Sequence, residues 1–230
     1  MIEIKGLKKI YKNVTVIDIE QLSISNNESF GLVGNNGAGK TTLFRMMLDL
    51  VKATEGIVTI DGKNVQGSDE WKKQVGSFLD EGFLIPYLTP NEYFRFVGNL
   101  HGYSTADLKA FLEKFEVIFH GEINGQNKYI GDLSKGNLKK VGIAASFIGN
   151  PQIIMLDEPF ENLDPTSQIR LKELLQAEHK LRQVTYLISS HDLNHVTEIC
   201  DRIVLLEKGK VIKDLRGSNT LAELESYFKG

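Results

Sequence analysis

The stretch that decides the fold reads Gly34-Asn35-Asn36-Gly37-Ala38-Gly39-Lys40-Thr41-Thr42. It follows the apolar run Phe30-Gly31-Leu32-Val33, which predicts a buried strand, and it leads into residues 43–48, which favour a helix. Strand, glycine-rich loop and helix in this order are the context that the phosphate-binding motif G-x-x-x-x-G-K-[ST] requires. A glycine-rich turn with a surface lysine is the alternative, and the specificity of the motif argues against it.

The residue types of this loop suit phosphate. Glycines let the backbone turn tightly without side chains, so that successive N–H groups can point at phosphate oxygens. The N-terminus of the following helix adds a partial positive charge. We expect Lys40 to bridge the β- and γ-phosphates and the Thr41 hydroxyl to bind Mg²⁺. The loop from Gly34 to Thr42 therefore predicts a binding site for a nucleoside triphosphate.

Composition and charge limit what the chain can be. Its 230 residues suffice for one domain, or for one domain with an inserted subdomain. The net charge of −3 provides no basic footprint, so we expect no nucleic-acid partner. No apolar stretch approaches the ~18 residues of a membrane-spanning helix, and the N-terminus lacks the apolar core of a secretory signal. A single cysteine, Cys200, excludes an internal disulfide, and together these features predict a soluble cytosolic protein.

The first part of the chain predicts strands. Residues 2–10 and 14–25 alternate apolar and polar positions around a turn at Lys12-Asn13, which indicates an antiparallel hairpin. Asp61-Gly62 is a strong signal for a second, tight hairpin. Further strands are expected at residues 29–33, 57–60, 63–65 and 75–79.

Helical periodicity begins at about residue 90 and continues to about 150, which predicts a helical subdomain inserted between two strands of the core. Strands and helices then alternate as in a sheet with crossover helices. We expect strands at 152–156, 184–189 and 202–206, helices at 166–180, 192–199 and 219–228, and a hairpin at Lys208-Gly209. The predicted fold class is α/β. A single domain, residues 1–230, combines a P-loop NTPase core and an N-terminal antiparallel β-subdomain (1–89 and 150–230) with a helical subdomain (90–149).

Two carboxylates follow the apolar run of residues 152–156. Asp157 stands where a parallel strand ends beside the phosphate loop, and a carboxylate there can hold a Mg²⁺-bound water. Glu158 would project towards the γ-phosphate and could orient or deprotonate the attacking water. A solvated acidic turn at the end of a strand is the alternative interpretation.

Five segments in this order resemble the ATPase subunit of ATP-binding cassette (ABC) transporters. They are the phosphate loop, Leu133-Ser134-Lys135-Gly136-Asn137, Ile153-Ile154-Met155-Leu156-Asp157-Glu158-Pro159, Asn162-Leu163-Asp164 and Ser189-Ser190-His191-Asp192. The resemblance covers essentially the whole chain, and the predicted helical insertion falls where this family has its helical subdomain. It implies the ABC ATPase fold, with ATP and Mg²⁺ as cofactors.

By this resemblance, Leu133–Asn137 matches the signature loop, whose family pattern is L-S-G-G-Q. The Ser134 hydroxyl and the Gly136 amide would contact the γ-phosphate held by a second subunit, and the helix that follows would offer its N-terminus to the anion. Without the family, Ser134 would be interpreted as a helix N-cap. Lys135 and Asn137 depart from the pattern.

The other family segments imply further roles. Asp164 belongs to a segment similar to the D-loop, which lies across the dimer interface. His191 occupies the position of the switch histidine, where a neutral imidazole could donate to the γ-phosphate; a surface or helix-capping histidine is the alternative. Tyr11 matches the aromatic residue that stacks on adenine, and packing at the hairpin tip is its alternative role.

The strongest departure from the family lies at the Gln-loop. Asp80 stands where the family delivers a glutamine to Mg²⁺ and the attacking water, and Glu81 follows it. A carboxylate can bind Mg²⁺, but it has a shorter reach and an added charge. Subunits of the exporter type sometimes carry an acid at this position, so we expect an active enzyme.

The resemblance implies a Mg²⁺-dependent ATPase that dimerises around ATP and powers a separate membrane permease, of the short bacterial exporter type. Such a subunit is cytoplasmic and peripheral on the cytoplasmic face of the cell membrane. We expect the permease to contact residues 80–91, where Phe83, Ile85 and Tyr87 are otherwise hard to place. The alternatives are a soluble ABC ATPase without a transport role, and a weakly hydrolysing partner in a heterodimer.

Overall fold

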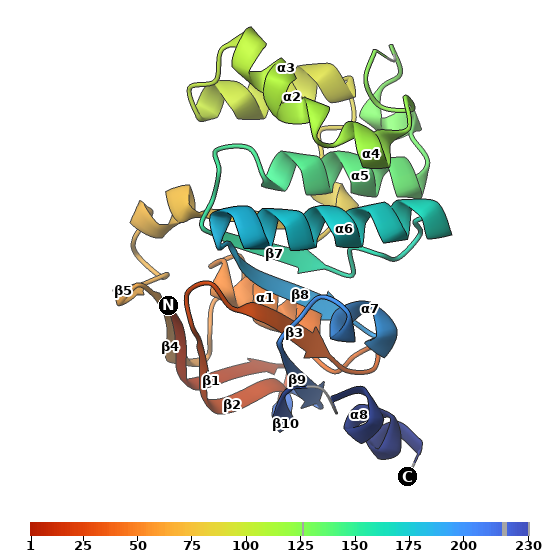
Figure 1. The fold of residues 1–230 in the computed structure, drawn as a ribbon. Coiled ribbons are helices and arrows are strands. Elements are labelled where there is room, and N and C mark those ends of the chain that lie inside the picture. Colours follow the sequence, from red (N-terminus) through yellow and green to blue (C-terminus); the bar gives the residue numbers. More distant parts are fainter. Residues whose placement is uncertain (126, 218–219, 230) are drawn as a thin grey trace.

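A six-stranded sheet runs through the computed structural model, which describes residues 1–125, 127–217 and 220–229 (Figure 1). The strand order is β10-β9-β3-β8-β7-β6; β10 is antiparallel to β9, and the other neighbours are parallel. Its strands are β3 (Ser29–Val33), β6 (Val75–Phe78), β7 (Ile153–Asp157), β8 (Thr185–Ser190), β9 (Arg202–Glu207) and β10 (Lys210–Arg216). Because the strands from β9 to β6 are parallel, their carboxyl ends share one edge, where open α/β sheets bind ligands.

A second, antiparallel sheet of four strands has the order β2-β1-β4-β5. It consists of β1 (Ile2–Tyr11), β2 (Val14–Ile24), β4 (Glu55–Ile60) and β5 (Lys63–Asn64). Both hairpins predicted for this sheet are confirmed. Tyr11 pairs with Val14 across the first turn, and Ile60 pairs with Lys63 across the second.

The two faces of the central sheet pack against different elements. Ile153 and Met155 face a core shared with the four-stranded sheet and α1 (Lys40–Met47), whereas Ile154 and Leu156 face a core shared with α5 (Lys135–Ser146) and α6 (Pro165–Arg182). Successive side chains of a strand point to opposite faces. Because both faces are covered, β7 is apolar throughout instead of alternating.

The helical subdomain is inserted between β6 and β7, which are parallel neighbours in the sheet, as the sequence predicted. It contains α2 (Pro90–Leu100), α3 (Thr105–Glu113), α4 (Glu116–Phe119) and α5. Thr89 and Glu92 form a capping box that starts α2. Aromatic rings pack together in the subdomain, with Phe94 stacked on Phe119 at a centroid distance of 6.0 Å and Phe115 edge-to-face with Phe147 at 5.4 Å.

Short 3₁₀ turns occupy Glu70–Gln74, Glu81–Phe83 and Ile130–Asp132. Two helices are shorter than expected. The first, α1, which the sequence predicts to continue to about residue 50, ends at Met47 because Asp49 adopts a left-handed backbone, with φ of 53°. The second, α7 (Leu193–Thr197), is predicted at 192–199; it starts after Asp192, which caps it, and ends at Thr197. The chain ends in α8 (Thr220–Lys229), and position 219 of the predicted last helix lies outside the described residues.

Candidate functional site

The predicted phosphate loop connects the end of β3 to the start of α1. Gly39 has φ of 109°, a backbone conformation that residues with a side chain rarely adopt, so the position favours glycine. Lys40 is buried, and its ammonium donates a 2.7 Å hydrogen bond to the carbonyl of Gly34 across the loop. No described side chain caps α1, so the N–H groups of its first turn are free to bind an anion.

Asp157 lies at the end of β7 and is buried. One of its carboxylate oxygens accepts a hydrogen bond from Thr41 Oγ1, and the other accepts one from Ser189 Oγ of β8. Burial raises the pKa of Asp157, and the hydrogen bonds from Ser189 and Thr41 oppose that rise. The structure thus brings together the hydroxyl and the carboxylate that the sequence predicted as metal ligands.

Glu158 lies between two cationic or polarisable groups. Its Oε1 is 3.3 Å from the Lys40 ammonium, and its Oε2 is 3.0 Å from Nδ1 of His191 and accepts a 3.2 Å hydrogen bond from the His191 amide. The Lys40 contact is an ion pair without hydrogen-bond geometry, so within the described residues Oε1 is a buried atom that accepts no hydrogen bond. The predicted catalytic pair, Glu158 and His191, is therefore in direct contact.

Asp80 begins the 3₁₀ turn after β6, and its carboxylate is already engaged. Oδ1 accepts a 2.7 Å hydrogen bond from the Gly82 amide, and Oδ2 lies 3.4 Å from Nη2 of Arg45. Asp80 nevertheless lines a cavity of about 300 Å³ together with Thr41 and Asp157. To bind a metal at those two residues, its carboxylate would have to leave Arg45.

The signature loop and Asp164 serve as helix caps in this single chain. Ser134 caps α5 by accepting a 3.3 Å hydrogen bond from the Asn137 amide. Asp164 caps α6 by accepting hydrogen bonds of 2.9 and 2.5 Å from the amide and hydroxyl of Ser167, which lower its pKa. Capping does not exclude a second role at a subunit interface, because the N-terminus of each helix remains able to attract an anion.

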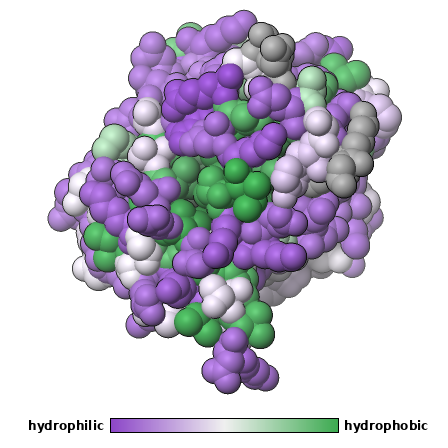
Figure 2. Space-filling model, turned by 90° about the horizontal axis from the view of Figure 1, so that it is seen from below, coloured by the Kyte–Doolittle hydropathy of each residue, from purple (hydrophilic) through white to green (hydrophobic). Residues whose placement is uncertain are grey.

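Tyr11 lies at the end of β1, next to the hairpin turn, and 45% of its surface is exposed. The ammonium of Lys9 is 4.7 Å from its ring centroid. Figure 2 shows the face of the molecule opposite the helical subdomain, with apolar side chains gathered near the middle of a polar surface. The four-stranded sheet and β10 lie on this side (Figure 1), and their exposed apolar residues include Tyr11, Val14 and Ile212. The ring of Tyr11 is accessible to a planar ligand.

Residues 18–161 match the family model described as ABC transporter. The chain belongs to the ABC transporter family. It has the ABC ATPase fold, as the sequence predicted, and it is an ATP-binding ATPase of this family. None of the helices in the described ranges is both long and apolar enough to cross a bilayer.

Individual relatives agree with this assignment. The ABC transporter ATP-binding protein NatA of Bacillus subtilis (strain 168) is 36% identical over 89% of this ABC ATPase and 82% of the relative. The lantibiotic transport ATP-binding protein SrtF of Streptococcus pyogenes is 31% identical to this chain over 97% of the chain and 95% of the relative. A dimeric structure of the ATP-binding cassette MJ0796, in a post-hydrolysis state bound to ADP and Pi, has a TM-score of 0.83 and 26% identity over 94% and 98% of the two chains.

Sequence reasoning missed two side chains at the centre of this ABC ATPase site. Ser189 hydrogen-bonds both Asp157 and the Glu158 amide; the sequence places it first in the segment 189–192, near the end of a buried strand, but does not indicate it as a site residue. Lys139 donates a 2.7 Å hydrogen bond to the Glu158 carbonyl and is buried. Its signal was a lysine on a helix whose following turns are apolar.

Proposed function

We propose that this ABC ATPase hydrolyses ATP with Glu158 as the general base and exports a cargo through a separate membrane subunit. One observation supports the role of Glu158 as general base. The Glu158 carboxylate is held between Lys40 and His191, and its Oε1 accepts no hydrogen bond within the described residues. A buried acceptor beside the phosphate loop is well suited to orient and deprotonate an attacking water. Lys40 and the N–H groups of the loop would stabilise the charge that develops on the transferred phosphate.

We propose Thr41 and Asp157 as Mg²⁺ ligands. A hydroxyl and a carboxylate are oxygen donors of the kind that Mg²⁺ prefers, and Mg²⁺ in nucleotide sites needs only one or two protein carboxylates because phosphates and waters complete its shell. This fits the described residues, among which no group of three His, Cys, Asp or Glu side chains could hold a metal alone. Bound there, Mg²⁺ would neutralise charge on the phosphates. Asp80 would join as a ligand only after release from Arg45.

The proposed active form is a dimer. The signature loop of one subunit, through Ser134 and Gly136, would contact the γ-phosphate bound by the other, and Asp164 would lie near the same interface. The N-terminus of α5 at this loop supports anion binding. The dimeric structure of the MJ0796 cassette supports the same arrangement.

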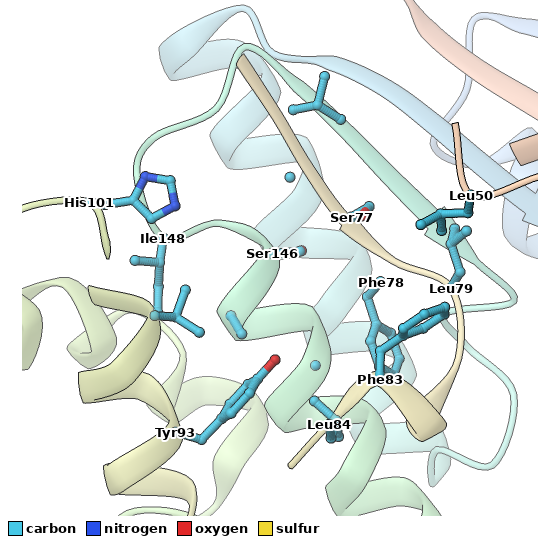
Figure 3. A pocket seen from close by; sticks show the side chains of 15 residues that line it. Leu50, Ser77, Phe78, Leu79, Phe83, Leu84, Tyr93, His101, Ser146 and Ile148 are labelled. Atoms are coloured by element: carbon cyan, nitrogen blue, oxygen red, sulfur yellow. The ribbon is translucent and has the colours of Figure 1, made fainter. Parts of the chain in front are cut away.

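A groove between the core and the helical subdomain is the proposed docking site for the permease. It has a volume of about 290 Å³ and is lined by β6, α2 and α5. Figure 3 shows Tyr93 and Ile148 on one side of it and Phe83 and Leu50 on the other. Phe83 and Leu50 are 56% and 52% exposed, and Tyr87, four residues after Phe83 in the chain, is 74% exposed. Apolar groups that stay exposed around a groove suit an apolar or amphipathic segment of a partner.

We propose export, and a location on the cytoplasmic face of the membrane, for this subunit; the similarity to SrtF, which is named for lantibiotic transport, supports a role in transport. We infer no nucleic-acid partner because the net charge of −3 offers no basic footprint.

The test is affinity purification of tagged Glu158→Gln protein from detergent-solubilised native membranes with ATP and Mg²⁺. We expect a multi-span membrane protein to co-purify, because blocked hydrolysis should hold the closed dimer and its permease together. The Lys40→Ala variant, which lacks the phosphate-binding ammonium, is the control and should retain less of it. Recovery of soluble partners alone would refute the transport role, and equal ATPase rates for the wild type and Glu158→Gln would refute the role of Glu158.

A further inference from the structure

The polar groups of Glu158 are held by several different elements. Its amide donates to Ser189 of β8 at 3.0 Å, and its carboxylate contacts Lys40 of α1 and His191 after β8. Its carbonyl accepts a 2.7 Å hydrogen bond from Lys139 of α5. Glu158 is thus fixed at its backbone as well as at its side chain.

This backbone needs such contacts because its conformation is unfavourable. Glu158 has φ of 47°, in the left-handed region that residues other than glycine seldom adopt. The next residue is Pro159, and a proline favours extended backbone at the residue before it. A carboxylate on such a residue is aimed by the conformation of its own peptide, so a contact that holds the peptide also directs the carboxylate.

Lys139 is placed for this contact more than for ion pairing. Its side chain is 5% exposed, and the closest carboxylate oxygens belong to Glu81 at 3.8 Å and Glu161 at 3.9 Å. Both distances exceed hydrogen-bond length. In the described ranges the Glu158 carbonyl is the acceptor that Lys139 hydrogen-bonds. A buried ammonium is costly unless it is well paired, so an ammonium that served only the two carboxylates would be expected to hydrogen-bond one of them.

A second contact fixes α5 against the same segment. A Cβ on Gly136 would lie 2.8 Å from the carbonyl oxygen of Asn162, so α5 approaches this loop as closely as only glycine allows. The first turns of α5 therefore contact both ends of the segment 158–162, with Lys139 at Glu158 and Gly136 at Asn162. This close packing explains why the Lys139 ammonium reaches the Glu158 peptide at a defined position.

We propose that Lys139 is a positioning residue for ATP hydrolysis, which holds the Glu158 peptide so that the carboxylate faces the attacking water. The proposal rests on the role of Glu158 as general base given above. Lys139 itself touches neither the water nor the phosphates in this scheme. Its loss should therefore lower turnover without weakening nucleotide binding.

The experiment compares kcat and ATP affinity of the purified full chain. For Lys139→Met we expect kcat to fall about 10- to 100-fold, the range that a misplaced catalytic group produces, while the Kd for ATP changes less than about twofold. Lys139→Arg should recover most of the lost kcat, since a guanidinium can still donate to the carbonyl. In the Glu158→Gln background, adding Lys139→Met should not lower the residual rate further, because both changes act through one group.

Lys140→Met is the matched control. Lys140 is the next residue of α5, its side chain is 4% exposed, and it pairs with Glu122 at 3.3 Å and not with Glu158. We expect its kcat to stay within about twofold of wild type. If Lys139→Met does not fold, the Lys139→Gln variant is used in its place, because the shorter, neutral glutamine side chain weakens the same hydrogen bond to the Glu158 carbonyl.

The outcomes separate the two claims. A wild-type rate for Glu158→Gln would refute the general base itself. An inactive Glu158→Gln together with a Lys139→Met rate no lower than that of Lys140→Met would overturn the positioning role alone. A fall in kcat that Lys139→Arg does not restore, or a matching loss of ATP affinity, would also overturn it.

Discussion

Replacement of Ser189 by alanine should destabilise the protein more than the same change at a buried serine that makes a single hydrogen bond. The hydroxyl is fully buried, donates to Asp157 and accepts a 3.0 Å hydrogen bond from the Glu158 amide. A buried amide without an acceptor costs about 1–3 kcal/mol, and a lost hydrogen bond to a charged group costs about 1.5–3 kcal/mol. Asp157 keeps its bond from Thr41, so we expect a total near the lower end of the summed range, about 3 kcal/mol.

Urea unfolding followed by circular dichroism, without nucleotide, measures this loss as a lower midpoint at constant slope. For a chain of this size, about 3 kcal/mol corresponds to a fall in Tm of about 6–12 °C. The matched control is Ser146→Ala, which loses a 2.7 Å hydrogen bond to the Ile143 carbonyl within α5. Because alanine favours a helix, the control should change stability by less than about 1 kcal/mol. A loss for Ser189→Ala no larger than that of the control would refute the reasoning.

Two further predictions concern the proposed metal ligands. Burial raises the pKa of Asp157 in the folded state above its usual 3.8. At pH values between these two pKa values, the folded state holds a proton on Asp157 that the unfolded state has lost, so the stability of the folded state falls as the pH rises. Asp157→Asn should therefore unfold at a higher temperature than wild type at neutral pH, and it should lose ATPase activity. The difference in stability between the variant and wild type should shrink at pH values below the unfolded-state pKa of Asp157. A variant that is less stable than wild type at pH 7 would contradict this. Arg45→Met should free Asp80 from the 3.4 Å ion pair and lower the Mg²⁺ concentration that gives half-maximal ATPase activity; an unchanged or higher concentration would argue against Asp80 as a metal ligand.

Much of the site could be predicted because its parts are local in sequence. The glycines of residues 34–39 predict a tight loop, and Gly39 adopts a positive φ that would strain a residue with a side chain. Asp157 and Glu158 follow an apolar strand, and the approach of Asp157 to Thr41 follows from the shared edge of a parallel sheet. The contacts of Asp80 could not be predicted in this way. The family position implied a metal ligand, but the sequence did not reveal that Arg45 holds this carboxylate in the structure described here.

Local sequence patterns were enough to predict the strands, the three hairpins, the phosphate loop and the order of the acidic and histidine segments. These features depend on backbone preferences and hydrophobic periodicity, which act over a few residues. The contacts that hold the Glu158 peptide, in contrast, become visible only in the folded chain. Lys139, 19 residues before Glu158, hydrogen-bonds its carbonyl, and Ser189, 31 residues after it, hydrogen-bonds its amide. Contacts of this kind depend on how α5 and β8 pack beside β7. Side chains from distant segments meet only when the whole core is assembled, and no local pattern encodes that meeting.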